Sequence, residues 1–565
     1  MTVAVEQSFA PPGPGTWFLD PTHFSRPATR FHAELFVPEF IRGFGEGFLR
    51  YGSLLEYLDW TFVNGFPYFS PRPVGAPPDA VGHPPKEIWN ELSRTDPEIR
   101  RRLETSASVF ERKLWREDLE RFDKETKPAA VREHLALLAV EPRALPTDEL
   151  LAYIDRCREN QKRGCHLQYL YTVPALLPIG DFVVHAQEWT GRSPAELLGL
   201  MQGTTPDPLG AADDLERFAE AVHQDREATV ILESEEEPAE LLSKLRGRPG
   251  ETGAAAAAYI DWVGYRPVNG EDVGDPNVIE LPGLIVQTMR AALEPLPAGP
   301  GAERLEERTA AVRAVVPSAH RDEFDELLGE ARALYRLRDE RGTYLGLWGI
   351  GIMRRAILAG GERLAEEGRI ELPEHLVEAD YGELQGLVVS GDGPPPAELA
   401  ERARYRSEAS YRDAPPFLGP EPGLPLPPEW LPPASARLER AIGTAVQAMF
   451  LAPEPRTEAA RVRGLGVSPG VHEGTARIIQ GPNQFGRLQK GDVLVTNATT
   501  AAFNIVLPLL GAIVTDRGGL LSHAAIVARE FGIPAVVGCS DATAVLPDGA
   551  RVRVDGAVGE VEVAS

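Results

Sequence analysis

Apolar residues recur every three or four positions through most of the chain before residue 430, which predicts amphipathic helices. The clearest examples are residues 129–141, 147–164, 212–224, 321–345 and 396–413. The most apolar later run, residues 342–361, contains Arg354 and Arg355, so we expect a buried core helix and not a membrane span. Residues 1–430 are therefore predicted to form a mainly α-helical domain.

The pattern changes at a proline-rich segment, residues 413–433, which can sustain neither a helix nor an inner strand. One more helix is expected at about residues 434–450, within a helix and flexible linker over residues 431–463. From Gly464 the chain consists of short β-branched runs closed by glycine turns, with one strong helix starting at Ser522. Residues 464–565 are therefore predicted to fold as a small mixed β/α domain.

Composition narrows the possible partners and the location. Lys and Arg total 58 and Asp and Glu total 84, a formal net charge of −26, so nucleic acid and anionic membrane surfaces are not expected as partners. The three cysteines, Cys157, Cys165 and Cys539, are too scattered for a disulfide scaffold or a zinc motif. The first residues lack a signal-peptide pattern, so a cytoplasmic location is expected.

His523 lies in the stretch with the most specific local chemistry. A buried strand is expected to end near residue 516, followed by a turn in which both glycines take positive φ and by a helix that ends at Gly532. His523 would then fall in the first turn of that helix, where free N–H groups and the helix dipole favour an anion. This position suits a histidine that carries a phosphoryl group on a ring nitrogen; a histidine packed in the core is the alternative.

The run "TDRGGLLSHAAIVAREFGIPAVVG" resembles the phosphohistidine signature of the phosphoenolpyruvate-utilising enzymes. That family includes pyruvate phosphate dikinase, phosphoenolpyruvate synthase, enzyme I of the sugar phosphotransferase system and rifampicin phosphotransferase. The resemblance implies that His523 carries phosphate on a swivelling domain covering residues 464–565. It also implies catalytic roles for Thr515, Ser522 and Arg529 and phosphate-binding roles for Gly518 and Gly519.

Members of this family charge the histidine with an ATP-grasp domain or with a barrel that follows the swivelling domain. No barrel pattern follows residue 565, and the first part of the chain lacks the nucleotide-loop pattern of an ATP-grasp unit. We therefore expect ATP and Mg²⁺ to be bound by a separate ATP-grasp subunit and no cofactor to be held tightly by this chain. Phenylphosphate synthase, in the same broad family, divides its functions between subunits in this way.

The helical part resembles the substrate domain of rifampicin phosphotransferases, less sharply. The segment "YIDWVGYRPVNGEDVGDPNVIELPGLI" keeps Gly264, Arg266, Glu280 and Pro282 of that domain, and "ALYRLRDERGTY" resembles its arginine-rich helix but departs from it after Arg338. We expect Arg266 and Arg338 to clamp the phosphoryl oxygens, although structural salt bridges are an equal alternative.

Two features of the acceptor site stay open. The proton acceptor for the substrate hydroxyl could be His166, Glu280, Asp261 or Asp59, of which His166 is favoured because it lies in a matched segment. An aromatic cluster that includes Trp60, Phe66 and Tyr68 could stack on a flat ring or could simply be core.

These inferences predict a subunit of an ATP-dependent, dikinase-type phosphotransferase. His523 would accept the β-phosphoryl group of ATP from the partner and transfer it to a phenolic small molecule, with the overall reaction ATP + ArOH + H₂O to AMP + Pi + aryl phosphate. The alternatives are a component of an antibiotic (rifamycin-like) phosphotransferase and a non-catalytic phosphocarrier or ligand-binding module.

Overall fold

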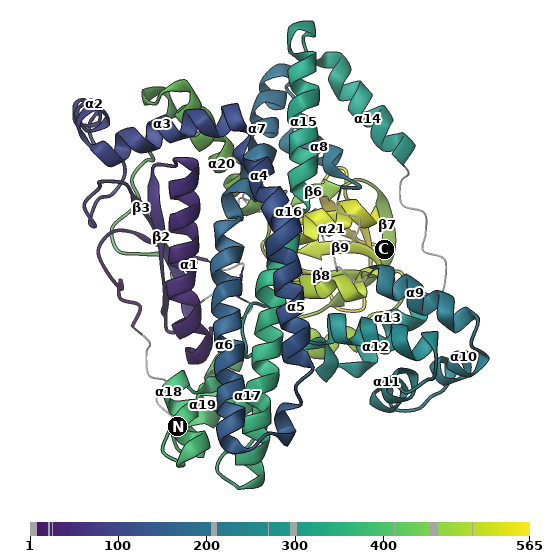
Figure 1. The fold of residues 1–565 in the computed structure, drawn as a ribbon. Helices are drawn as coiled ribbons and strands as arrows, with labels where there is room; N and C mark the ends of the chain where they lie inside the picture. The colour runs from purple at the N-terminus through teal and green to yellow at the C-terminus, as the bar shows by residue number, and fades with distance from the viewer. Residues whose placement is uncertain are drawn as a thin grey trace. The chain divides into compact units, whose positions relative to one another are not determined.

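The computed structural model describes residues 8–20, 23–24, 26–204, 212–268, 270–293, 302–411, 413–450, 461–499 and 501–564. The chain divides into two compact units (Figure 1). Unit 1 comprises Met1–Pro174, Gly270–Asp275 and Tyr344–Arg440, and unit 2 comprises Ala175–Asn269, Pro276–Thr343 and Ala441–Ser565. The two units are described separately below.

Unit 1 is a helical layer beside a small sheet. Its helices are α1 (Arg30–Tyr51), α2 (Lys86–Thr95), α3 (Pro97–Arg112), α4 (Leu114–Arg121), α5 (Lys127–Leu138), α6 (Thr147–Leu170), α17 (Trp348–Glu366), α18 (Tyr381–Val389) and α19 (Pro396–Glu408). Helix α6 packs against both α1 and α17. The buried run around Arg354 forms α17 and the π-helical turn Gly342–Leu347 before it, so the expected core helix is confirmed.

The sheet of unit 1 was not expected from the sequence. Its strands β1 (Trp17–Leu19), β2 (Leu55–Val63), β3 (Phe66–Pro73) and β4 (Phe417–Leu418) are antiparallel, in the order β2-β3-β1-β4. Strands β2 and β3 form a hairpin around Asn64 and Gly65, whose φ angles of 52° and 78° are those of a type I′ turn. The Asn-Gly pair between two aromatic runs is the signal that predicts such a hairpin.

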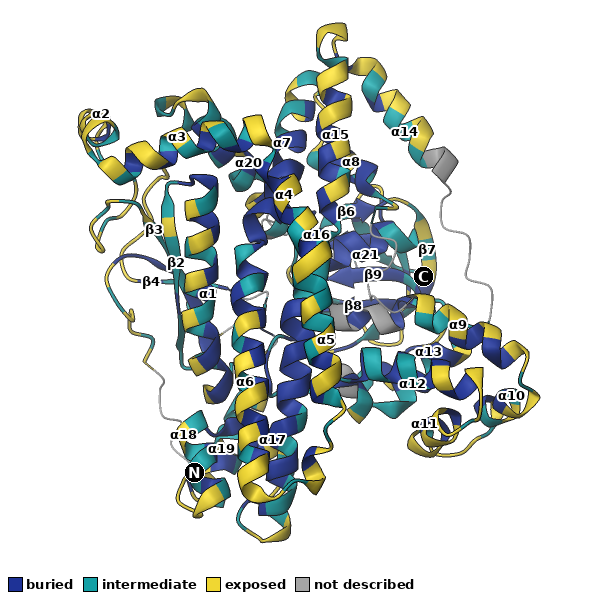
Figure 2. Ribbon diagram, in the orientation of Figure 1, coloured by how far each residue is buried: buried dark blue, intermediate teal, exposed yellow. Residues whose placement is uncertain are grey.

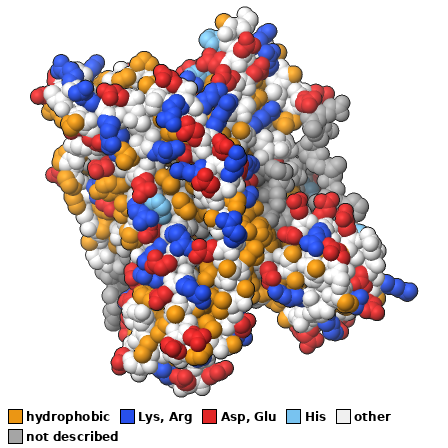
Figure 3. Space-filling model, viewed as in Figure 1, with side chains coloured by type: hydrophobic (Ala, Val, Ile, Leu, Met, Phe, Trp, Pro, Cys, Tyr) orange, Lys and Arg blue, Asp and Glu red, His pale blue; other side chains and the backbone are white. Residues whose placement is uncertain are grey.

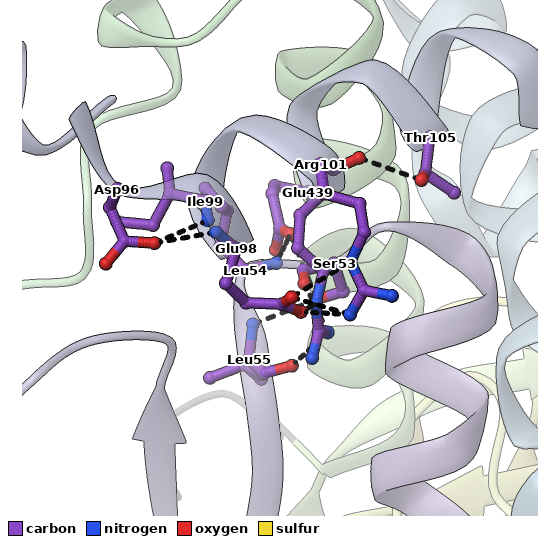
Figure 4. A network of polar contacts seen from close by, with 10 residues as sticks. Ser53, Leu54, Leu55, Asp96, Glu98, Ile99, Arg101, Thr105 and Glu439 are labelled. Atoms are coloured by element: carbon purple, nitrogen blue, oxygen red, sulfur yellow. Dashed lines mark hydrogen bonds and ion pairs between the residues drawn. The ribbon is translucent and has the colours of Figure 1, made fainter. Parts of the chain in front are cut away.

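A polar network ties α3 to neighbouring segments of unit 1 (Figure 4). The Asp96 carboxylate accepts hydrogen bonds from the first N–H groups of α3 and so caps that helix. The half-buried Glu439 accepts hydrogen bonds from the Ser53 hydroxyl and the Leu54 N–H, each at 3.0 Å, and desolvation of the carboxylate raises its pKa. Glu439 belongs to α20 (Pro433–Phe450), so these bonds fix the first part of α20 to the loop after α1.

Unit 2 combines helices with an eight-stranded mixed sheet. Its helices are α8 (Pro194–Leu198), α9 (Ala212–His223), α10 (Arg226–Glu233), α11 (Pro238–Arg246), α12 (Glu251–Gly264), α13 (Pro282–Ala291), α14 (Ala302–Val315), α15 (Arg321–Tyr335), α16 (Leu337–Arg341), α21 (His523–Phe531) and α22 (Ala542–Val545). Helices α7 (Thr172–Thr190) and α20 have residues in both units.

The strands of the mixed sheet are β5 (Arg461–Arg463), β6 (Leu465–Ser468), β7 (Val471–Ile478), β8 (Asp492–Thr496), β9 (Leu510–Thr515), β10 (Ala535–Val537), β11 (Arg551–Asp555) and β12 (Glu560–Val563). They run in the order β5-β12-β11-β7-β8-β9-β10-β6, and β7 to β10 are parallel. Every residue of β8 is buried, as in a parallel sheet covered on both faces (Figure 2). Helix α21 packs across β6, β9 and β10.

A helical part and a small mixed β/α part are therefore both present, as expected. The boundaries at residues 430 and 464 stay a prediction, because unit 2 groups the mixed sheet with helices from earlier in the chain. Among the described residues, one stretch, Thr147–Thr190, is long and apolar enough to cross a membrane, and 83% of its most apolar window is buried within the protein. Such burial is also typical of a core helix. On the face shown in Figure 3, basic and acidic side chains are interspersed.

Candidate functional site

His523 is the first residue of α21. Strand β9 delivers the chain to the loop before it, and Ser522 caps the helix by accepting the Ala525 N–H with its hydroxyl at 3.4 Å. Gly532, with φ of 64°, ends the helix. The strand, turn and helix predicted around His523 are therefore all present, and His523 lies where the helix dipole favours an anion.

Glycine is required at positions 518 and 519, before His523, for two different structural reasons. Gly518 has φ of 111° and allows the turn, as expected. Gly519 does not adopt positive φ, which corrects the expectation for that residue. A Cβ on Gly519 would lie 2.3 Å from the carbonyl oxygen of Ala448, so a close approach of backbone requires glycine there. The Thr515 hydroxyl closes the turn by donating to the Arg517 carbonyl at 2.7 Å.

The two ring nitrogens of His523 have different surroundings. Nδ1 lies 3.0 Å from the hydroxyl oxygen of Thr499, whereas Nε2 is buried and has no hydrogen-bond partner within the described ranges. The side chain is 9% exposed. Burial lowers its pKa to about 4, with smaller and opposing contributions from Asp339, which raises it, and Arg338, which lowers it. The ring is therefore neutral at neutral pH, and a ring that donates its Nδ1 proton to Thr499 presents a lone pair at Nε2.

Arg338 and Asp339 of α16 are the charged residues that act on His523. They form an ion pair of 2.5 Å between Nη1 and Oδ1, and both side chains are largely buried. The structure thus places the predicted Arg338 close enough to His523 for its charge to affect the pKa of the ring. Asp339 was missed by sequence reasoning, although it directly follows Arg338 in the matched helix. Thr499 was also missed. It follows β8, and the carboxyl ends of the parallel strands β8 and β9 lie side by side. Residues that follow neighbouring parallel strands lie close together, so this pattern could have indicated Thr499.

Arg529 lies less than two turns farther along α21 and holds the loop before His523 in place. Its Nε donates to the Val467 carbonyl and its Nη1 to the Leu520 carbonyl, both at 2.8 Å, while Nη1 also lies 3.4 Å from the Tyr335 hydroxyl. These contacts hold the loop against β6 and α15. The catalytic roles given to Thr515, Ser522 and Arg529 stay predictions.

The remaining site candidates of unit 2 have other neighbours. Arg266 is buried with its guanidinium 5.6 Å from the centroid of the Trp262 ring. The exposed Glu280 accepts the Asn277 N–H at 2.8 Å and closes a short 3₁₀ turn. Asp261 pairs with Arg246 at 2.6 Å. Among the described residues, His523 is hydrogen-bonded to Thr499 and affected by the charges of Arg338 and Asp339, and not by Arg266, Glu280 or Asp261.

The other candidates belong to unit 1. His166 Nδ1 accepts from Arg42 at 2.9 Å, and its Nε2 lies 3.1 Å from the Glu46 carboxylate; burial lowers the pKa of His166. Asp59 pairs with Arg72 at 3.0 Å. Trp60, Phe66 and Tyr68 are all at most 4% exposed and belong to one apolar core cluster.

The Tyr68 hydroxyl donates to the Pro415 carbonyl at 2.9 Å, and burial raises its pKa to about 12. The packing thus favours the core interpretation of the aromatic cluster.

A cavity of about 670 Å³ lies in unit 2 between α10, α11 and α13. The acidic run that starts at Glu233 and the side chain of Arg290 both line this cavity, and Arg290 donates hydrogen bonds to the carbonyl groups of Leu232 and Ser234. None of the predicted site residues lines it. Within the described residues, no group of three or more His, Cys, Asp or Glu side chains is arranged to hold a metal ion.

Comparisons with known proteins identify related families for two segments of the chain. Residues 488–559 match the family described as PEP-utilising enzyme, mobile domain, and residues 183–339 match the rifampicin phosphotransferase fourth domain. The first matched segment contains His523, and the second, which ends at Asp339, contains Arg338 and Asp339. The resemblance to the phosphoenolpyruvate-utilising enzymes, and within them to rifampicin phosphotransferase, is thereby confirmed.

Three relatives illustrate the extent of the similarity. Rifampicin phosphotransferase of Streptomyces sviceus is 28% identical over 67% of this chain and 42% of its own length. An uncharacterised phosphotransferase of Bacillus subtilis, YvkC, is 33% identical over 43% of this chain and 28% of its own length. A probable phosphoenolpyruvate synthase of Archaeoglobus fulgidus is 47% identical over 18% of this chain and 13% of its own length. The chain thus spans less than half the length of each of these relatives.

Proposed function

We propose that this chain carries a phosphoryl group on Nε2 of His523 and transfers it to the hydroxyl group of a small molecule. The observation that carries the proposal is the buried Nε2 at the start of α21, without a hydrogen-bond partner among the described residues and under the charges of Arg338 and Asp339. A neutral, partly desolvated imidazole nitrogen is a good nucleophile toward phosphorus, and the N-terminal end of α21 favours the resulting anion.

The first step of the proposed reaction charges His523. The Nε2 lone pair forms a bond to the β-phosphorus of ATP as the bond from that phosphorus to the oxygen shared with the α-phosphate breaks, which releases AMP. Water then cleaves the linkage between the β- and γ-phosphoryl groups, which releases inorganic phosphate and leaves phosphohistidine. ATP and Mg²⁺ are assigned to a separate ATP-grasp subunit. In support, none of the four strands described outside the mixed sheet carries a lysine, whereas an ATP-grasp unit is expected to place one on a strand.

The second step discharges His523. The acceptor oxygen attacks phosphorus as the P–Nε2 bond breaks, and the electron pair returns to the ring. Phosphoryl transfer needs positive charge around the moving group and a base for the hydroxyl proton. We assign these roles to Arg338 and to the carboxylate of Asp339 respectively. We choose Asp339 as the base because its charge raises the pKa of His523, so it lies close to the ring. The charges of the earlier candidates, His166, Glu280, Asp261 and Asp59, have no such effect on His523.

A phenol is the acceptor class that this base suits best. The proton of a phenol has a pKa near 10, similar to tyrosine, and is lost far more readily than that of an aliphatic alcohol. A carboxylate is a weak base, so it assists the transfer more effectively when the leaving proton is phenolic. The product would be an aryl phosphate.

A second candidate function is phosphorylation of a rifamycin-like antibiotic. It is favoured by the match of residues 183–339 to the fourth domain of rifampicin phosphotransferase and by the 28% identity to that enzyme in Streptomyces sviceus. Both functions use the same carrier and the same charged pair, and they differ only in the acceptor.

A chase experiment separates these functions. The chain is charged with ³²P through its ATP-grasp partner, freed of nucleotide, and mixed with phenol, with rifampicin or with buffer alone. The proposal predicts rapid loss of acid-labile label from His523 with phenol and recovery of the label as phenyl phosphate. Transfer to rifampicin alone would replace the phenol proposal with the antibiotic function, and retention of label in all three samples would indicate a phosphocarrier without acceptor activity.

A further inference from the structure

The C-terminal end of α20 contacts the loop before His523. The last carbonyl groups of an α-helix have no partner within the helix and need one elsewhere. Here the Met449 carbonyl accepts the Gly519 N–H at 3.0 Å, and the Ala448 carbonyl accepts the Leu521 N–H at 2.9 Å. The loop that carries His523 therefore supplies the C-terminal cap of α20.

This contact explains why residue 519 is glycine. Its backbone conformation is accessible to other residues, but a Cβ there would lie 2.3 Å from the Ala448 carbonyl oxygen and 3.0 Å from backbone of Met449. Any side chain would force the loop and the helix apart. By contrast, a Cβ on Gly443, in the middle of α20, would meet nothing within 4 Å.

Two further contacts connect the same region to the helical part of unit 2. Arg529 Nη1 lies 3.4 Å from the Tyr335 hydroxyl of α15, and the Gly203 N–H donates to the Glu530 carboxylate at 2.8 Å. Together with the α20 contact, they hold α21 where Arg338 and Asp339 act on His523. These hydrogen bonds are polar contacts that water can replace. Residues of α21, α15 and α20 also belong to one apolar core cluster, so departure from the docked position must expose apolar surface as well.

We infer that the C-terminal end of α20 holds the domain that carries His523, residues 464–565, in a docked position. Gly519 is the residue that positions this domain against α20. This inference rests on the proposed function, because a carrier must leave the charged pair to be recharged elsewhere. In the docked position, Ala448 and Met449 hold the loop, and His523 faces the acceptor side. When the domain departs, the two hydrogen bonds break and the last carbonyl groups of α20 become solvated.

Hydrogen–deuterium exchange tests the contact between α20 and the loop before His523, and it requires no phosphoryl transfer. The purified chain is compared with Gly519→Ala and with the matched control Gly443→Ala, which adds the same methyl group to α20 away from the contact. Docking predicts that Gly519→Ala raises exchange by at least about tenfold in both residues 441–449 and residues 518–522, while β8 and β9 stay protected. The control should leave all of these segments unchanged. Unchanged exchange in residues 441–449 and 518–522 of Gly519→Ala would overturn the inference.

If β8 and β9 also lose protection in Gly519→Ala, the variant has unfolded, and wild-type exchange in increasing urea decides instead. If the two segments hold each other, residues 441–449 and residues 518–522 should lose protection at the same urea concentration, before β8 and β9 do. Loss of protection in the two segments at different urea concentrations would contradict the inference. The rates of charging and of discharge are also measured on the folded variant. Docking predicts that Gly519→Ala slows discharge to the acceptor more than it slows charging. Equal losses of rate in charging and in discharge would instead assign Gly519 to phosphate binding. If the chain is never charged, but Gly519→Ala still raises exchange in both segments, the proposed function fails and the inferred contact stands.

Discussion

The hydroxyl oxygen of Thr499 lies 3.0 Å from Nδ1 of His523, and the opposite ring nitrogen has no hydrogen-bond partner in the described part of the chain. A single contact thus distinguishes the two nitrogens. It fixes the ring orientation, and a proton on Nδ1 leaves Nε2 able to attack phosphorus. The same division of roles, with one nitrogen held and the other reactive, is common wherever histidine acts as a nucleophile or ligand.

Removal of the Thr499 hydroxyl should slow charging of His523. Thr499→Val keeps the side-chain shape but cannot accept the Nδ1 proton, so the ring loses its preferred tautomer. We expect charging to fall by about tenfold, the lower end of the range for partners that orient a functional histidine. Thr499→Ser should retain most of the rate. The measurement is the initial rate of acid-labile label on His523, and equal rates in Thr499→Val and wild type would remove Thr499 from the account.

The low pKa of His523 predicts a specific pH dependence of stability. The folded ring has a pKa of about 4, and an exposed histidine has 6.5. Between these values the unfolded chain binds a proton that the folded chain does not, so stability is lost as the pH falls from 6.5 toward 4. The contribution of His523 amounts to about 3 kcal/mol at most.

His523→Gln isolates this contribution, because other groups titrate equally in both proteins. The difference in urea unfolding free energy between wild type and His523→Gln should change with pH between 6.5 and 4 and stay constant above pH 7.5. A difference that does not vary with pH would show that His523 titrates as an exposed residue. The same neutral ring predicts that charging does not decline from protonation of His523 down to about pH 5.

The Arg338–Asp339 pair should control discharge more than charging. Arg338→Gln removes the positive charge offered to the phosphoryl group, and Asp339→Asn removes the base, so each should slow transfer to a phenol by about a hundredfold. Charging on the ATP-grasp subunit should be nearly unchanged. Asp325→Asn, which removes an exposed carboxylate from the preceding helix α15, is the matched control. Equal losses in charging and discharge would show that the pair serves the fold rather than the acceptor step.

Trp60 should matter for stability rather than for acceptor binding. Its ring is 4% exposed and lies 4.3 Å from the ring of Phe40 and 5.7 Å from that of Phe36, centroid to centroid. Trp60→Ala should lower the unfolding free energy by about 3–5 kcal/mol. Leu424→Ala, at a side chain that is 75% exposed, should change it by less than about 0.5 kcal/mol. A stable Trp60→Ala variant with a raised KM for the phenol would restore the stacking hypothesis.

Local sequence patterns predicted much of the carrier region. The end of β9, the positive φ of Gly518, the start of α21 at His523 and its end at Gly532 all follow from residue types with narrow conformational preferences. The role of Gly519 could not be predicted in this way. Its cause is the carbonyl of Ala448, 71 residues earlier in the chain, and no local pattern records such an approach.

The acceptor side was harder to predict for the same reason. Arg338 was found through a resemblance, whereas Asp339 became visible only when packing brought α16 near His523. His166 had a plausible type and position, yet its neighbours are Arg42 and Glu46 of α1. The β2–β3 hairpin was overlooked although its Asn64-Gly65 turn is a strong local signal, because helical periodicity elsewhere in that region directed the interpretation.

The most direct test of the central claim is the position of label on the chain after incubation with ATP labelled separately at the β and γ positions, with and without the proposed ATP-grasp partner. The account predicts acid-labile β-label on Nε2 of His523, only when the partner is present, and no γ-label. Label on His523 without the partner would contradict the separate nucleotide site, and an unlabelled His523 beside an ATP-consuming partner would contradict the carrier role itself.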